Sequence, residues 1–129
     1  MGSEVSDDES LARYVFSKSH VRQDRTIRRA AFIPNPHDEL SVTRRKGLEP
    51  DEVMRKGMSV AAERGKTLQG CANVTAKVVS TQGLNTIPAP VDANPNHANI
   101  VGWPENYDER KPLAEALAVA SGQLEEPRK

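Results

Sequence analysis

The sequence predicts an α+β fold with a mostly antiparallel sheet of three to five strands and two helices. Residues 68–80 alternate between apolar and polar side chains, which is typical of a strand with one buried face. Residues 48–65 and 111–121 instead carry apolar side chains at helical spacing. Several strand-like stretches precede the first helix, which argues against a regularly alternating α/β fold.

The length of the chain suits one domain. Its 129 residues are 36% hydrophobic and only 4% aromatic, so the core must come mainly from Val, Leu, Ile and Ala. Residues 1–9 are acidic and have little to bury, and residues 125–129 follow the last helix, so both ends are expected to be disordered. We therefore expect a single domain over residues 1–129, with its core between about residues 11 and 122.

The charge and the cysteine content exclude several classes of protein. Lys and Arg number 18, as do Asp and Glu, so the net charge is zero and no overall field attracts nucleic acid or an anionic membrane. No stretch reaches the roughly 18 consecutive apolar residues of a membrane helix, and no N-terminal segment has a signal-peptide core. Cys71 is the only cysteine, so no internal disulfide can form, which is typical of a cytoplasmic protein.

The first part of the chain predicts strands. Residues 11–16 predict a first strand, although a short helical turn would also explain them. Residues 26–33 predict a second strand that ends at Pro34, and residues 39–45 predict a third. The stretch between the last two is rich in Pro, Asn and Asp, which form turns. We therefore expect residues 26–45 to form a hairpin with a short loop.

Residues 48–65 give the best helical signal in the chain. Pro50 suits the first turn of a helix, where its missing N–H costs nothing, and Gly65 suits the left-handed residue after the last turn. Met54 and Met58 lie on one apolar face with two alanines. The predicted strand follows almost at once, so the helix is expected to lie on the sheet, antiparallel to that strand.

The last third of the chain predicts a loop, a strand and a helix. Residues 85–96 contain three prolines and three asparagines and predict an irregular loop. Residues 97–104 predict a short strand, and residues 106–109 predict a turn. Residues 111–121 predict the second helix, with Pro112 in its first turn.

Basic side chains gather in the N-terminal half, where nine of the 18 Lys and Arg residues lie between Arg13 and Lys46. Guanidinium groups match phosphate oxygens because they donate two parallel N–H bonds. In the predicted hairpin Arg28 and Arg45 project near each other. The alternative is a solvated sheet face whose arginines pair with acidic residues of the same chain. The expected ligand-binding arginines are Arg22, Arg25, Arg28, Arg29, Arg44 and Arg45.

His20 and His97 are the candidate catalytic residues. His97 enters a short strand after a proline-rich loop, where it can line a cleft and serve as general acid or base. His20 lies in a run of hydroxyl and basic side chains that suits a phosphodiester, with Arg22 or Arg28 stabilising charge. For each histidine the alternative is an ordinary loop residue that bonds to the backbone.

No metal or cofactor site is predicted. Cys71 and the three histidines are scattered without zinc-ligand spacing, and the glycines match neither a Walker loop nor a dinucleotide fingerprint. Cys71 within a strand is expected to be packing filler. Trp103 beside Pro104 is a candidate for contact with a ligand or partner, although a lone tryptophan can also close one end of a small core.

These patterns predict a small binding or accessory protein whose basic hairpin contacts a phosphate-bearing ligand, nucleic acid or an acidic partner. One alternative is a small phosphodiester- or nucleotide-directed enzyme that uses His20 and His97 with arginines. Another is a homo-oligomeric structural protein whose sheet edge or Trp103 forms the interface. Convergence of the histidines and arginines on one concave site would favour the enzyme. No membrane partner is expected.

Overall fold

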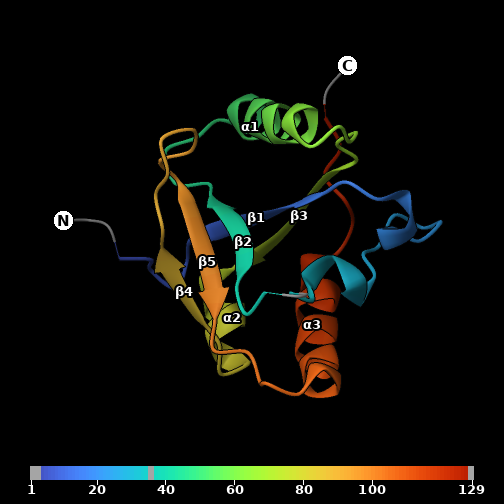
Figure 1. Cartoon of the computed structure of the whole chain (residues 1–129), viewed down its shortest axis with the longest axis vertical. Coiled ribbons are helices and arrows are strands. Elements are labelled where there is room, and N and C mark those ends of the chain that lie inside the picture. Colours follow the sequence, from blue (N-terminus) through green and yellow to red (C-terminus); the bar gives the residue numbers. More distant parts are fainter. Residues whose placement is uncertain (1–3, 35–36, 128–129) are drawn as a thin grey trace.

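The computed structural model describes residues 4–34 and 37–127 and shows an α+β fold (Figure 1). Within these residues a five-stranded antiparallel sheet is combined with three α-helices, so the predicted fold class is confirmed with one helix more than expected. The strands are β1 (Ser10–Val15), β2 (Leu40–Arg44), β3 (Gly70–Thr75), β4 (Asn85–Pro88) and β5 (His97–Val101). The helices are α1 (Pro50–Glu63), α2 (Ala76–Thr81) and α3 (Tyr107–Ser121), with the short 3₁₀ helices η1 (Lys18–His20) and η2 (Arg29–Phe32).

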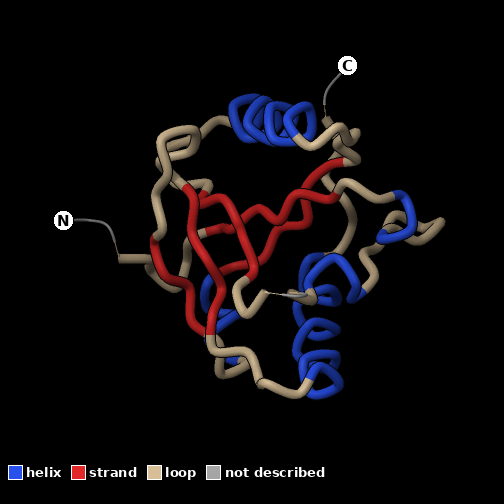
Figure 2. The backbone as a smooth tube through the Cα atoms, viewed as in Figure 1, coloured by secondary structure: helices blue, strands red, loops and turns tan. Residues whose placement is uncertain are grey.

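The sheet has the strand order β3-β1-β2-β5-β4, and its middle is weakly joined. β1 pairs with β3 at all six of its residues. It pairs with β2 at only two positions, Leu11 opposite Arg44 and Ala12 opposite Thr43. In Figure 1 β1 and β3 run across the view while β2 and β5 run down it, and Figure 2 shows the same two groups of strands diverging. The sheet therefore opens between β1 and β2.

Apolar side chains are buried on both faces of the sheet. The larger cluster joins Leu11 of β1 to Phe32 of η2 and Leu117 of α3. The smaller cluster joins Ala12 of β1 to Met54 of α1. Leu11 and Ala12 are neighbours in the chain and enter different clusters because successive strand side chains point to opposite faces. One face is thus filled by α2, α3 and η2, and α1 lies apart from these helices (Figure 1).

α1 forms within the stretch predicted for the first helix. Pro50 is its first residue, and Glu49 and Glu52 form a capping box in which the Glu49 N–H donates to Glu52 Oε1 at 2.9 Å. Gly57 brings the helix close to Tyr14, because a Cβ at Gly57 would lie 2.7 Å from Tyr14 Cε1. α1 therefore docks tightly at one point, through the smaller cluster.

The long strand predicted over residues 68–80 was wrong in its second half. β3 ends at Thr75, and residues 76–81 form α2. The Thr75 side chain accepts a hydrogen bond from the Val78 N–H at 3.3 Å, which caps the helix. Ala76 and Val79 are both buried on one side of α2. The apolar residues in this stretch fit a strand and a short helix equally well, and the Thr75 cap decides between them.

The second predicted strand, residues 26–33, and its hairpin with residues 39–45 were also wrong. Residues 29–32 form η2, and two consecutive residues, Ala31 and Phe32, are buried, which an alternating strand would not allow. β2 pairs with β1 and β5 instead. Arg28 and Arg45 consequently do not face each other across a hairpin.

Two further predictions near the C-terminus need correction. Residues 85–88 form β4, which pairs with β5 at the edge of the sheet, so the predicted loop is shorter than expected. An edge strand tolerates Pro88, which has no N–H to donate. The predicted turn at residues 106–109 is the start of α3, because the Asn106 side chain caps the Asp108 N–H at 2.8 Å. Pro112 lies inside α3 and not in its first turn.

Candidate functional site

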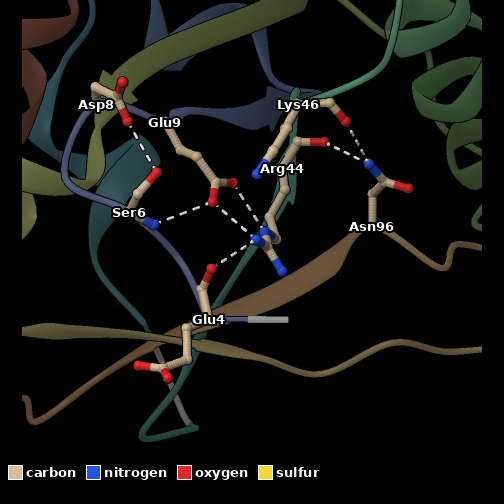
Figure 3. A network of polar contacts seen from close by, with 7 residues as sticks. All are labelled: Glu4, Ser6, Asp8, Glu9, Arg44, Lys46 and Asn96. Carbon is tan, nitrogen blue, oxygen red and sulfur yellow. Dashed lines mark hydrogen bonds and ion pairs between the residues drawn. The ribbon is translucent and has the colours of Figure 1, made fainter. Parts of the chain in front are cut away.

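Arg44 forms an ion pair within the molecule. Its Nε donates to Glu9 Oε1 at 2.9 Å and its Nη2 donates to Glu9 Oε2 at 2.7 Å, and Nη2 also donates to the Glu4 carbonyl (Figure 3). The Glu9 side chain is only 4% exposed. The hydrogen bond from Arg44 lowers the pKa of Glu9 below its usual range. This pair fixes the segment before β1 to the middle of the sheet.

Other arginines of the predicted basic surface also have partners in the molecule. Arg45 pairs with Glu125 and donates to Asn73 Oδ1 at 2.8 Å. Arg25 pairs with Glu126 at 3.1 Å. Both acids lie in the C-terminal segment that was expected to be disordered, as Glu9 lies in the N-terminal one. Pairing within the chain, the alternative for this basic surface, therefore describes half of its arginines.

The remaining arginines of that surface lie apart from one another. Arg22 donates to the Ile27 carbonyl at 2.9 Å. Arg28 and Arg29 are exposed, and no carboxylate among the described residues lies within ion-pair distance of either. Trp103 is only 8% exposed, and its indole N–H donates to the Ile100 carbonyl at 2.9 Å. The tryptophan therefore closes the core, which was its alternative role.

A cavity of about 570 Å³ lies between α1 and the open part of the sheet. α1 contributes one flank of the helix, and β1 and β2 contribute the opposite wall. His97 lines this cavity. His20 and the six arginines that were singled out do not line it. Of the expected site residues, the structure brings only His97 into this cavity.

Arg13 occupies the gap where β1 and β2 separate. Its Nε donates to the Ala31 carbonyl at 2.8 Å, and its Nη1 donates to the Ser41 carbonyl in β2 at 3.0 Å. The side chain thereby joins β1 to η2 through the Ala31 carbonyl and to β2 through the Ser41 carbonyl. Within the described part of the chain, the Nη2 amino group donates to no protein atom. Arg13 also lines the cavity. Its guanidinium therefore has N–H donors that are not used by the described chain at the edge of this cavity.

Positive charge dominates the cavity. Arg13, Arg55, Lys56 and Arg64 line it with a single acid, Glu63. Among the described residues no carboxylate lies within ion-pair distance of any of these four cations. Burial, and secondarily the charge of Arg64, lowers the pKa of Arg13 to about 10. Arg13 therefore lies close to a second positive charge and has no carboxylate partner among the described residues.

Polar groups near this cluster have fixed orientations. His97 Nδ1 lies 2.9 Å from the Ala89 carbonyl, which can only accept, so Nδ1 carries a proton and Nε2 holds the lone pair of the neutral ring. Asn94 Nδ2 donates to Thr43 Oγ1 at 3.0 Å. The Tyr14 hydroxyl donates to the Val53 carbonyl at 2.7 Å, and burial raises its pKa to about 12. Tyr14 therefore serves as a wall and not as an acid or base.

The other candidate chemistries find no support in the structure. The Cys71 thiol is fully buried, 3.8 Å from the sulfur of Met54, and burial raises its pKa to about 12, so it is packing. Burial, followed by the charges of Arg13 and Lys66, lowers the pKa of His20. In residues 4–34 and 37–127 no group of three or more His, Cys, Asp or Glu side chains could hold a metal ion. No helix in the same residues is long and apolar enough to cross a membrane.

Most of the cavity residues were missed by the sequence interpretation. Arg13 was counted in the basic segment and among the arginines that could converge with the histidines on one site, and it is the one of those arginines that lines the cavity with His97. Lys56, Val60 and Arg64 repeat every four residues, so they follow one side of α1 next to its apolar face. That spacing was the available signal. Comparison with protein-family models, curated proteins and solved structures found no match to the chain.

Proposed function

We propose that the protein binds a small anion-bearing ligand in the cavity between α1 and the sheet. The observation that carries this proposal is Arg13, a half-buried cation held by two carbonyl oxygens and by no carboxylate of the described chain. The proposed ligand is still of the anionic class expected from the basic N-terminal half, but its site is the cavity and not the surface of the predicted hairpin. A carboxylate or phosphate oxygen there would receive charge-assisted hydrogen bonds from Arg13.

The test is a titration of the full chain with inorganic phosphate, 2-naphthoate and 2-naphthyl phosphate, followed by amide chemical shifts. We expect saturable binding of at least one of these anions, with shifts confined to β1, β2, α1 and the loop before β5. Arg13→Gln should weaken binding by about tenfold or more, and Arg28→Gln, an exposed arginine outside the cavity, should not. Arg64→Gln, a change at an exposed helix end, should weaken binding in the same direction even if Arg13→Gln fails to fold.

Two results would overturn the proposal. The first is that none of the three anions binds at millimolar concentration. The second is that the anions bind equally well to the Arg13 and Arg64 variants. In either case the cations around the cavity are a solvated surface.

The cytoplasmic location expected from the cysteine content is a separate prediction, which this experiment does not test.

A second candidate is an enzyme that acts on phosphoesters, with His97 as general base. The observation that favours it is the His97 Nε2 lone pair on a wall of the cationic cavity. The test is hydrolysis of bis-p-nitrophenyl phosphate by the purified chain. Turnover that His97→Gln abolishes while the fold is retained supports the enzyme, and an absence of turnover leaves the binding function.

A further inference from the structure

Apolar side chains, which we call its apolar wall, line the cavity together with its charges. Six of the lining residues have apolar or aromatic side chains, namely Tyr14, Phe16, Val42, Val60, Val91 and Ala93. Val91 is 51% exposed, so this wall presents apolar surface to water. From this we infer that the ligand is a small aromatic anion, whose ring lies against this wall while its anionic group meets Arg13. The inference rests on the proposed function and specifies its ligand.

The aromatic part of the wall is held in place. The rings of Tyr14 and Phe16 lie 6.4 Å apart and are tilted by 46°. The Tyr14 hydroxyl is fixed by Val53, and its ring contacts Gly57 of α1. Arg64 lies over the Phe16 ring, 5.7 Å from its centre. A flat ring that entered the cavity would therefore meet the Tyr14 and Phe16 rings together with the Arg64 cation that lies over Phe16.

The charge and the size of the cavity favour one anionic group. Four cations and one acid line it, and Arg64 is close enough to Arg13 to lower the pKa of its guanidinium. A cavity of about 570 Å³ is within the usual range for a small organic ligand. A polyanion would need a continuous row of exposed cations, whereas Arg25, Arg44 and Arg45 are paired inside the molecule.

Arg13 also limits how the anion can be held. Nε and one N–H of Nη1 donate to carbonyl oxygens. The donors that remain are Nη2 and the second N–H of Nη1, both at the end of the guanidinium. These two donors form a fork that matches a pair of oxygens on one carboxylate or phosphate. A carboxylate and a phosphate both offer such a pair of oxygens, so both are tested.

The experiment compares matched probes on the full chain by titration calorimetry. The aromatic anions are 2-naphthoate and 2-naphthyl phosphate, the small anions are acetate and inorganic phosphate, and the neutral ring is 2-naphthol. We expect each aromatic anion to bind about tenfold or more tightly than its small counterpart and than 2-naphthol. The preferred aromatic anion identifies the anionic group.

Variants separate the ring from the charge. Phe16→Leu keeps an apolar side chain and removes the aromatic face, so it should weaken the aromatic anions several-fold and leave acetate and phosphate unchanged. Val119→Ala, a change at a residue that is 71% exposed on α3, is the matched control and should change neither. The inference is overturned, with the proposed function intact, if acetate or phosphate binds as tightly as the aromatic anions and still depends on Arg13. Equal binding of 2-naphthol and 2-naphthoate, unaffected by Arg13→Gln, overturns both.

Discussion

The guanidinium groups of two half-buried arginines on neighbouring strands have different hydrogen-bond partners. Arg44 donates hydrogen bonds to both oxygens of the Glu9 carboxylate, so its charge is neutralised within the molecule. Arg13 donates only to the backbone carbonyl oxygens of Ala31 and Ser41, which carry no full charge. A paired charge adds to structural specificity, whereas a charge without a counter-ion in a cavity attracts one. This difference at single residues separates a structural arginine from a candidate ligand contact.

Removing the Glu9 charge should destabilise the fold. Glu9→Gln leaves the mostly buried Arg44 guanidinium without its carboxylate, and we expect the free energy of unfolding to fall by about 2 kcal/mol. Urea denaturation of the full chain measures the change. Glu4→Gln is the control, because the Glu4 side chain is exposed and only its backbone carbonyl accepts from Arg44. A loss no larger than that of the control would mean that the ion pair contributes little.

The same carboxylate should make stability depend on pH. Hydrogen bonding to Arg44 lowers the pKa of Glu9 in the folded chain below its ordinary value of 4.5, and Arg45 does the same for Glu125. The stabilisation is therefore complete above the unfolded pKa, and it is lost as the pH falls through the lower folded pKa. We expect the free energy of unfolding to decline below about pH 5. The decline should be shallower in Glu9→Gln, and an unchanged slope would contradict this assignment.

At the scale of elements, α1 is attached to the sheet through the smaller cluster, with Val53 and Met54 buried and Gly57 close to the Tyr14 ring. Gly57 lies where any side chain would meet the Tyr14 ring, and the Tyr14 hydroxyl is bonded to the same helix at Val53. The rest of the cavity-facing flank contacts no filled core, which is why space remains beside it. Gly57 thus allows α1 to approach β1 closely at this point.

Gly57→Ala should test this contact. Alanine favours a helix over glycine by about 1 kcal/mol, but its Cβ would lie 2.7 Å from the Tyr14 ring, and such crowding costs about 1–3 kcal/mol. We expect a net loss of stability by thermal denaturation. Ala62→Gly, at an exposed position of the same helix, should show the propensity term alone, a loss of about 1 kcal/mol. A more stable Gly57→Ala variant would show that α1 can move away from β1 without cost.

The elements differ in how well the sequence could predict them. The stretches of β1, β2, β5 and α1 were identified correctly. β2, β5 and α1 have clear periodicity, and α1 has Pro50 as a boundary residue, whereas a helical turn was also open for β1. α2 was missed because its apolar residues continue the alternation of β3, and the Thr75 cap is a single local contact. η2 was missed because the burial of Phe32 depends on α3, which lies far away in the chain.

At the scale of the whole molecule, the site depends on which strands are neighbours. His97 was identified because a histidine after a proline-rich loop is a local pattern. The position of Arg13 could not be predicted in this way, because it depends on where β1 diverges from β2. That divergence is set by the pairing of β1 with residues 70–75 and of β2 with residues 97–101. The pairing of arginines with Glu9 and Glu125 likewise joins distant parts of the chain.

The balanced charge of the molecule predicts a weak effect of salt on binding. The formal net charge is zero, so no overall field adds to the attraction that the local cations of the cavity exert on an anion. Raising the salt concentration from about 0.05 M to about 0.5 M should weaken 2-naphthoate binding by less than about tenfold. Calorimetry at several salt concentrations gives the slope. A steep slope, with a loss of about a thousandfold or more, would instead indicate a polyanion-binding surface.

The two-residue junction between β1 and β2 has a consequence for motion. It divides the sheet into a β3–β1 half and a β2–β5–β4 half, which are joined by the pairs Leu11 with Arg44 and Ala12 with Thr43. Local opening at so short a seam requires the loss of few hydrogen bonds, so its amides should exchange with deuterium before those of the strand interiors. An occupant of the cavity would touch both halves at once, and the seam would then exchange more slowly.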